Sequence, residues 1–296
     1  MSDASRPAPK SLVAALHTTA LRLHGRLSID AFHWRARLQS AWRRAPTLRI
    51  LVAPHPHFEP RLRNSLHGHA IRLTVSPLEQ ADLAAHDLVV PLRTADALWL
   101  ADRRDTLVRQ RLPVCRAEIV RLCDDKLALN RRLIALGFGE HVPALLPWMQ
   151  WPCVLKGRWS TDSAATHLIR DADDAARHAS TCDEAAYFCQ EAVHDPREYA
   201  SHLVVENGRI RHHLTNEYHC REPLFINGGR VSYTRRLVCT PHLHLLERML
   251  AAIGFEGLCC VDYKVRDGRL QLLEINPRLG GSLAPSFGAF MRAFAD

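Results

Sequence analysis

The alternation of apolar and polar residues predicts a β-hairpin near the C-terminal end of the chain. Residues 259–265 read Cys-Cys-Val-Asp-Tyr-Lys-Val, and residues 270–275 read Leu-Gln-Leu-Leu-Glu-Ile. Both runs have the composition of strands, and Asp267-Gly268 between them is a turn signal. Each strand carries one carboxylate, Asp262 and Glu274, at a position where an apolar side chain would be ordinary.

The register of this hairpin decides whether the two carboxylates meet. A two-residue turn would place Asp262 opposite Leu273, which sends Asp262 and Glu274 to opposite faces. A three-residue loop over 267–269, or one bulge, places Asp262 opposite Glu274. A shared cation site therefore predicts the odd loop or the bulge, and a two-residue turn without a bulge would contradict it.

Apolar runs in the first third of the chain predict a small α/β unit. Residues 48–54, 71–75 and 87–92 have the pattern of buried strands, two of them stopped by proline, and helical spacers separate them. This order favours a parallel sheet. Residues 11–44 have the spacing of one or two amphipathic helices, which we interpret as a packing or dimerisation appendage.

The remaining pattern alternates helices and strands. Asp124-Asp125-Lys126 opens a helix that Gly137 ends, and Thr240-Pro241 opens another that Gly254 ends. Strands are predicted at 152–156, at 187–193, and in a hairpin of 202–205 and 209–213 around Asn207-Gly208.

Composition limits the class of protein. The 296 residues are 47% hydrophobic and 24% charged, which is typical of a globular protein with one large or two to three small domains. No apolar run approaches the roughly 20 residues that span a bilayer, and residues 1–10 do not have the pattern of a signal peptide. The nine cysteines have no metal-ligand spacing. We therefore expect a cytoplasmic protein with reduced thiols and no membrane association.

The net charge of +8 comes mainly from arginine and is spread along the chain. No basic run with interleaved aromatic residues is present, so we expect no nucleic-acid partner. A site for an anionic nucleotide explains part of the charge. The hairpin supports such a site, because Asp262, Glu274 and Asn276 supply the hard oxygen ligands that Mg²⁺ prefers, and Arg278 supplies a planar fork for phosphate.

The order of these features resembles the ATP-grasp superfamily over residues 123–281. The matching elements are an Asp-Lys helix start, a strand that ends in lysine, a Gln-Glu-x-Val strand, a downstream glutamate, and the Asp…Glu-x-Asn-Pro-Arg hairpin. The resemblance implies an α/β fold with the nucleotide between two lobes. After the helical extension (1–45) that the apolar spacing predicts, it implies a pre-ATP-grasp α/β domain (46–121) and an ATP-grasp domain (122–296) with a small lid lobe at about 140–190.

The resemblance also implies a role for each matching residue. The phosphate-binding lysines are Lys126 and Lys156. The adenine hinge is Gln190, Glu191 and Val193, and the ribose-binding acid is Glu198. The metal ligands are Asp262, Glu274 and Asn276, for two Mg²⁺ ions or Mn²⁺ in their place. The catalytic residues are Arg278, Lys156 and Asn276, and Lys126, Lys156 and Arg278 would offset the negative charge that develops during phosphoryl transfer. The acceptor side of the cleft is predicted at Arg235, Gly280, Gly281 and Ser282.

The chain departs from the family after Lys156. The family has a glycine-rich loop there, whereas residues 157–165 read Gly-Arg-Trp-Ser-Thr-Asp-Ser-Ala-Ala. Three hydroxyl side chains could bind phosphate, but Asp162 is an unfavourable neighbour for a triphosphate. The loop therefore predicts slower or unusual chemistry.

The resemblance implies a carboxylate–amine ligase that uses ATP. A carboxylic acid, an amino acid or peptide among the candidates, would be activated as an acyl-phosphate and transferred to an amine, with release of ADP. Two alternatives stay open, a kinase-like phosphotransferase and a nucleotide-binding module with weakened catalysis. The expected partners are the small-molecule acid and amine, with a homodimer as a further expectation.

Overall fold

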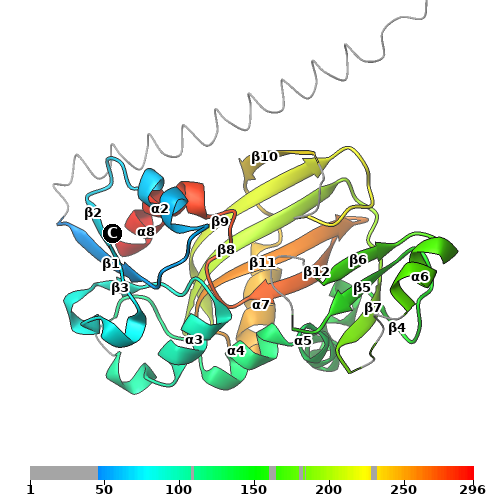
Figure 1. Ribbon diagram of the computed structural model, residues 1–296, viewed down its shortest axis with the longest axis horizontal. Helices are drawn as coiled ribbons and strands as arrows, with labels where there is room; N and C mark the ends of the chain where they lie inside the picture. The colour runs from blue at the N-terminus through cyan, green and yellow to red at the C-terminus, as the bar shows by residue number, and fades with distance from the viewer. Residues whose placement is uncertain (1–45, 108–109, 160–164, 180–182, 184, 228–231) are drawn as a thin grey trace, which may run out of the picture.

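The computed structural model describes residues 46–107, 110–159, 165–179, 183, 185–227 and 232–296. The predicted helical extension at 1–45 and most of the glycine-poor loop, 160–164, lie outside the described residues. Three sheets follow one another across the molecule, with a small parallel sheet at one end and a small antiparallel sheet at the other (Figure 1).

The first unit is a parallel sheet, as the apolar pattern predicts. Its strands β1 (Leu48–Val52), β2 (Ile71–Val75) and β3 (Leu88–Val89) lie in the order β2-β1-β3. Helices α2 (Glu59–Ser65) and α3 (Thr94–Ala101) belong to the same unit. Strand β3 is shorter than predicted, in keeping with Pro91, which has no N–H to donate to a ladder.

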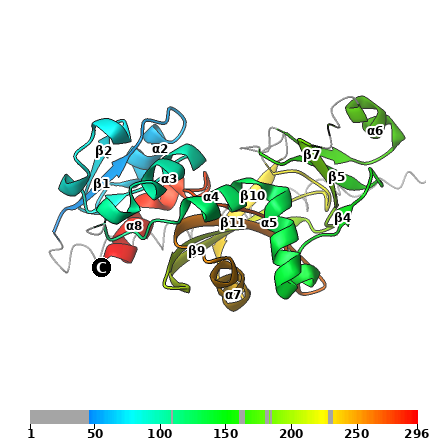
Figure 2. The ribbon, with the colours of Figure 1, turned by 90° about the horizontal axis from the view of Figure 1, so that it is seen from below.

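The central sheet is antiparallel and has the order β10-β9-β8-β11-β12. Its strands are β8 (Arg197–Glu206), β9 (Arg209–Cys220), β10 (Tyr233–Val238), β11 (Gly257–Arg266) and β12 (Arg269–Asn276). Helices α4 (Ala117–Asp124), α5 (Lys126–Leu133) and α7 (Leu243–Ile253) lie along it, with α7 across one face (Figures 1 and 2).

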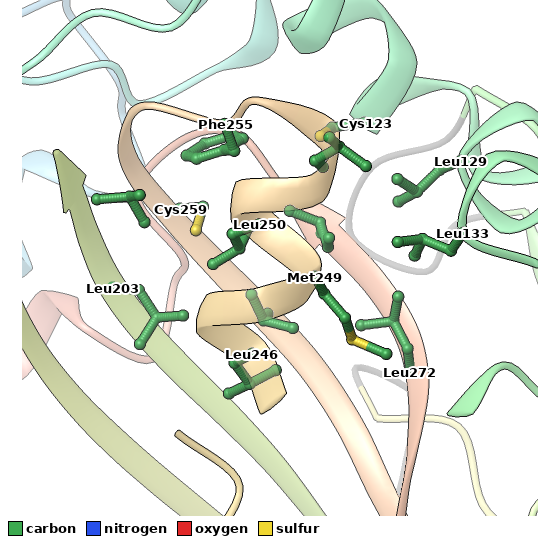
Figure 3. Close-up of a cluster of buried hydrophobic side chains, with 14 of the residues drawn as sticks. Cys123, Leu129, Leu133, Leu203, Leu246, Met249, Leu250, Phe255, Cys259 and Leu272 are labelled. Carbon is green, nitrogen blue, oxygen red and sulfur yellow. The ribbon is translucent and has the colours of Figure 1, made fainter. Parts of the chain in front are cut away.

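Side-chain alternation gives the central sheet two different faces. Cys259, Val261 and Tyr263 of β11 belong to the large apolar core under α7, together with Leu246, Met249 and Leu250 of the helix (Figure 3). The intervening residues of β11 point to the other face, as the period of two requires. This alternation leaves the face opposite α7 for polar chemistry.

The lid lobe is a second antiparallel sheet with the order β4-β7-β5-β6. Its elements are β4 (Leu145–Leu146), β5 (Cys153–Gly157), β6 (Thr166–Ile169), α6 (Ala172–His178) and β7 (Tyr187–Glu191). A small core of Cys153, Leu155, Ile169 and Cys189 belongs to this lobe. Figure 2 shows the lobe beyond the end of the central sheet, away from the parallel sheet.

The last helix, α8 (Phe287–Ala295), returns to the first unit. Phe287 and Phe290 share one core with Ile50 of β1 and Val204 of β8. The parallel sheet and the central sheet are therefore joined by a common apolar cluster. Among the described residues, no helix has both the length and the hydropathy to cross a membrane, and the eight described cysteines are all free thiols.

Several predicted boundaries need correction. The hairpin around Asn207-Gly208 is longer than predicted on both sides, and strands β6 and β10 were not predicted. Helix α7 begins at Leu243 and not at Thr240, whose hydroxyl instead accepts a hydrogen bond from the backbone of His242 at 3.1 Å. The predicted stop at Gly254 is confirmed, with φ of 72°. Helix α5 ends at Leu133, before the predicted Gly137, which has φ of 87° inside a π-helical segment, Ile134–Phe138.

Candidate active site

The hairpin of β11 and β12 brings Asp262 and Glu274 opposite each other, as the cation hypothesis requires. Its turn is the tight two-residue form, with positive φ at Asp267 and Gly268. The register shifts between Asp262 and Tyr263, so that Tyr263 pairs with Leu272 and Asp262 pairs with Glu274. The bulge that restores the pairing is thus at Leu273 in the strand and not in the loop.

Asn276 joins the two carboxylates. Its Nδ2 donates to Asp262 Oδ2 at 3.1 Å and to Glu274 Oε1 at 2.8 Å. Its Oδ1 accepts from Arg278 Nη2 at 3.1 Å. The Asn276 N–H groups thus lie between the two carboxylates. A bound cation would contact the same carboxylate oxygens.

The electrostatics of this pair favour a divalent cation. Burial and the neighbouring Glu274 carboxylate raise the pKa of Asp262 well above its usual range. Burial also opposes ionisation of Glu274, but Lys126 and the hydrogen bond from Asn276 lower its pKa below the ordinary value. Two opposed carboxylates suit Mg²⁺, and the Asn276 amide would add its oxygen if it were flipped from the orientation seen here. The residues present therefore fit the metal that the fold family implies.

Two buried lysines face the carboxylates from the other elements. Lys126 begins α5, where the Asp125 carboxylate caps the helix by accepting from Ala128 N at 3.1 Å. Its Nζ lies 3.6 Å from Glu274 Oε2. Lys156, on β5 of the lid lobe, donates to Gln190 Oε1 at 2.7 Å and to the carbonyl of Leu273 at 3.2 Å. The bulge thus turns a carbonyl toward the lid lobe. Burial lowers the pKa of Lys156 to about 8.

The predicted hinge lies at the end of β7. Gln190 is buried and donates through Nε2 to the carbonyl of Pro143 at 3.1 Å, which fixes the amide that holds Lys156. Glu191 forms an ion pair with Arg266 of β11. Val193 is buried just after the strand. The ion pair of Glu191 with Arg266 therefore joins the hinge to the central sheet.

Glu198 and Lys264 lie on neighbouring strands of the central sheet. Burial raises the pKa of Glu198 to about 7, against the opposing charge of Lys264. Lys264 Nζ donates to the carbonyls of Asp195 at 3.1 Å, Pro223 at 3.3 Å and Val193 at 3.4 Å. It also lies 3.9 Å from the centre of the Phe225 ring. One ammonium group thus ties β11 to the hinge and to the loop after β9.

The other end of the site is formed by the turn after Arg278. Arg278 is buried and donates through Nη1 to the carbonyl of Leu279 at 2.9 Å. Ser282 Oγ lies 2.7 Å from Nε2 of His202. Arg235 of β10 reaches the carbonyl of Ser282 at 3.4 Å through Nη1. Arg61 of α2 donates to the carbonyl of Gly281 at 2.9 Å, so the first unit touches this turn.

These groups line one cavity of about 360 Å³ between the lid lobe and the central sheet. Its lining includes every predicted site residue except Arg235. Arg235 donates a hydrogen bond to the carbonyl of Ser282, which is part of the lining. The lining thus combines the two lysines, the predicted hinge, the paired carboxylates and the glycine turn. A cavity with apolar walls and several convergent charged groups is typical of a small-molecule site.

Comparisons with known proteins identify the fold. No model of a known protein family matches the chain, and no curated protein matches its sequence. Solved structures do match. A D-alanine–D-alanine ligase from Bacillus anthracis is 14% identical with a TM-score of 0.56, over 84% of this chain and 92% of that chain. The ATP complex of the same kind of enzyme is 12% identical with a TM-score of 0.54, over 85% and 98%. An L-amino acid ligase from Bacillus licheniformis is 14% identical with a TM-score of 0.55, over 82% and 70%.

The chain has the ATP-grasp fold. The α/β class and the resemblance predicted from the motifs are thereby confirmed. In this fold the central sheet and the lid sheet both line the cleft, and the Asp…Glu-x-Asn-Pro-Arg hairpin contributes its carboxylates to the lining.

Sequence reasoning missed Lys264 and Tyr218, which line the cleft, and His202, which lies behind its wall. Lys264 is one of the chain's four lysines, and it follows Asp262 by two residues, so strand alternation places both on one face. That signal could have found it. Tyr218 and His202 come from the β8–β9 hairpin and meet Ser282 only in the fold. No local pattern marks either of them.

Proposed function

We propose that the protein is an ATP-dependent carboxylate–amine ligase that releases ADP. The observation that carries the proposal is the cavity that joins two buried lysines, a pair of opposed carboxylates and a buried arginine beside the acceptor turn. Similar structures include a D-alanine–D-alanine ligase and an L-amino acid ligase. This likeness supports an amino acid or peptide as the acid.

In the proposed reaction, a carboxylate oxygen of the acid attacks the γ-phosphorus of ATP, and the bond to the β-γ bridging oxygen breaks. The amine nitrogen then attacks the acyl carbon, phosphate leaves, and the amine loses a proton. Lys126 and Lys156 would offset the phosphate charge, and Arg278 would neutralise the charge at the acyl-phosphate. Gln190, Glu191 and Val193 would hold the adenine, and Glu198 the ribose.

Asp262, Glu274 and Asn276 would hold Mg²⁺, which supplies charge neutralisation on the phosphates when it is bound. The chain itself contributes position. Lys156 is fixed by Gln190 and the Leu273 carbonyl, so its ammonium is oriented before the nucleotide arrives. On the acceptor side, Arg235, Gly280, Gly281 and Ser282 would contact the acid or the amine.

Phosphate release from MgATP tests this proposal. Amino acids and small carboxylic acids are screened singly and in pairs, with ammonia and primary amines as partners. A ligase releases ADP and phosphate in quantity only when an acid and an amine are both present. Transfer of phosphate to one stable acceptor would establish the kinase alternative. MgATP binding without release would establish a binding module, the alternative that the glycine-poor loop 157–165 motivates.

Glu274→Ala gives the first prediction. Removal of one metal-binding carboxylate should abolish turnover, with a loss of at least about 100-fold, because the phosphate charge is no longer balanced. The melting temperature should stay close to that of the wild type. Glu140→Ala is the matched control, since Glu140 is an exposed carboxylate that pairs with Arg269 at 3.7 Å outside the cleft. Wild-type rates in Glu274→Ala would refute the metal assignment.

A further inference from the structure

His202 lies beneath the acceptor turn and has no role in the function proposed so far. It is on β8, its side chain is fully buried, and its Nε2 lies 2.7 Å from Ser282 Oγ. The Tyr218 hydroxyl of β9 shares a hydrogen bond with the same Ser282. Ser282 and Tyr218 both line the cleft, whereas His202 stands behind them. The three residues form a buried support for one hydroxyl group at the cavity wall.

The turn is pressed directly onto this support. A Cβ atom at Gly280 would stand 2.7 Å from Cε1 of His202 and 2.6 Å from Sγ of Cys260. These distances are too short for any side chain, so the turn requires glycine at 280. The closeness of backbone and imidazole means that the ring determines where Ser282 stands.

The hydrogen bonds of His202 select one tautomer. Its Nδ1 is buried and has no hydrogen-bond partner among the described residues. A buried N–H without an acceptor costs about 1–3 kcal/mol, so the proton is favoured on Nε2. Burial, reinforced by the charges of Arg235 and Arg278, lowers the pKa of His202 to about 3, which keeps the ring neutral. Nε2–H then donates to Ser282 Oγ.

This tautomer leaves a hydroxyl proton for the cleft. Ser282 Oγ accepts from His202, so its own proton, or that of the Tyr218 hydroxyl bonded to it, is free to point into the cavity. The Arg235 guanidinium reaches the Ser282 carbonyl, and the buried Arg278 lies in the same wall. Asp262 is the nearby negative group, and it belongs to the metal site.

We infer that His202 is a positioning residue that makes the bonded hydroxyl pair of Ser282 and Tyr218 a hydrogen-bond donor for a carboxylate of the acceptor molecule. The inference rests on the proposed function only in naming the acceptor. An acceptor with a free carboxylate, such as an amino acid that offers its amine, matches a wall of one hydroxyl donor flanked by two guanidinium groups. The corresponding carboxamide would lack the negative charge. Its N–H groups would also face the hydroxyl and guanidinium groups, which are themselves donors.

Nitrogen NMR of histidine-labelled protein tests the tautomer without ATP or turnover. The His202 signals are assigned with His202→Gln. We expect Nε2 to carry the proton and its signal to shift in Ser282→Ala, with Nδ1 unprotonated in both. A proton on Nδ1, or an Nε2 signal that ignores Ser282→Ala, overturns the inference.

Acetate and acetamide then test the ligand class as probes of the cleft. Acetate should move the Nε2–H signal of His202 in the wild type and bind about 10-fold or more weakly to Ser282→Ala, which removes one hydrogen bond to a charged group. Acetamide, and sodium chloride at equal ionic strength, should leave the signal in place. Equal shifts from acetamide or chloride overturn the inference.

Variants at His202 complete the test if turnover is found. His202→Gln keeps a donor near the position of Nε2 and should retain the wild-type KM for the acceptor, whereas His202→Leu should raise that KM about 10-fold and leave the KM for ATP unchanged. An equal rise in both KM values overturns a positioning role. If His202→Leu fails to fold, the NMR arm and Ser282→Ala still decide. Absence of ligase turnover would contradict the proposed function. The NMR measurement of the tautomer and the acetate titration would still test the inference about His202.

Discussion

Lys264 is a buried side chain that ties the hinge to the central sheet. Its ammonium satisfies three backbone carbonyls, from Val193, Asp195 and Pro223, and lies over the Phe225 ring. Burial lowers its pKa, and the nearby Glu198 carboxylate opposes that shift. Lys264 therefore has two effects in the cleft. It holds the backbone of the hinge in position, and its positive charge offsets the negative charge of the Glu198 carboxylate.

We predict that Lys264→Met weakens MgADP binding about 10-fold or more. The substitution leaves buried carbonyls without a donor, which costs about 1–3 kcal/mol for each unsatisfied group, and the hinge is then free to move. Titration calorimetry with MgADP measures the effect. Arg269→Met is the control, because Arg269 is an exposed residue of the same hairpin. An unchanged Kd for MgADP in Lys264→Met would show that the hinge does not need the tie.

The difference between predicted and missed residues has a physical reason. Asp262, Glu274 and Asn276 lie within one hairpin, so strand periodicity and turn chemistry are enough to relate them. Ser282 and His202 are 80 residues apart in the chain, and a neutral histidine in a strand resembles any other half-apolar residue. Contacts of that range are set by sheet order, which the local pattern does not contain.

At the scale of elements, the bulge on β12 shows how a small irregularity serves the site. The tight turn alone would have separated the carboxylates, and the extra residue, Leu273, restores their pairing. The same residue turns its carbonyl toward Lys156 of the lid lobe. Turn residues predicted the turn, and only the chemistry of the paired carboxylates required the bulge, whose position in the strand could not be read from the pattern.

The docking of helix α8 on β9 should be sensitive to acid. The His212 ring packs 4.5 Å from the Phe290 ring and 6.5 Å from the Phe294 ring, measured between centroids. Burial lowers the pKa of His212 to about 4. Because the unfolded chain takes up this proton near pH 6.5 and the folded protein only near pH 4, the stabilisation is complete above about pH 6.5 and is lost as the pH falls toward 4.

We predict that His212→Leu loses part of this acid sensitivity. Between pH 7 and pH 4.5 its melting temperature should fall by a few degrees less than that of the wild type, since about 1 kcal/mol shifts Tm by roughly 2–4 °C in a chain of this size. Differential scanning calorimetry across this range makes the comparison. His244→Leu, at an exposed site on α7, should follow the wild type. Parallel curves for His212→Leu and the wild type would contradict the assignment.

At the scale of the whole molecule, three sheets are held by unequal cores. Motif order predicted the ATP-grasp fold, and strand spacing predicted the parallel first unit. Both could be predicted because each motif and each strand is recognised within a short stretch of the chain. The return of α8 to the first unit could not be predicted, since an amphipathic helix at 287–295 would fit against several faces. Its return merges the first unit and the central sheet into one apolar cluster.

This division of cores predicts how the molecule opens. The lid lobe has a small core of Cys153, Leu155, Ile169 and Cys189, whereas β1 and β8 share the larger cluster with α8. Units with few apolar contacts open at lower free energy than the global transition. In native-state hydrogen exchange, amides of β5 and β7 should therefore exchange at a lower free energy than those of β8 and β11, and the slowest amides of β1 should match β8.

MgADP should raise the protection of the lid lobe more than that of the central sheet, because the nucleotide would join Lys156 and the hinge to the hairpin carboxylates across the cleft. The Glu274→Ala variant supplies the control, since a weakened metal site should remove most of this added protection while the exchange of β8 stays unchanged. Exchange of β1 at the low free energy of β5 would show that the shared core does not couple the first unit to the sheet. If the lid lobe is as protected as β11 before nucleotide is added, its small core does not determine its free energy of opening.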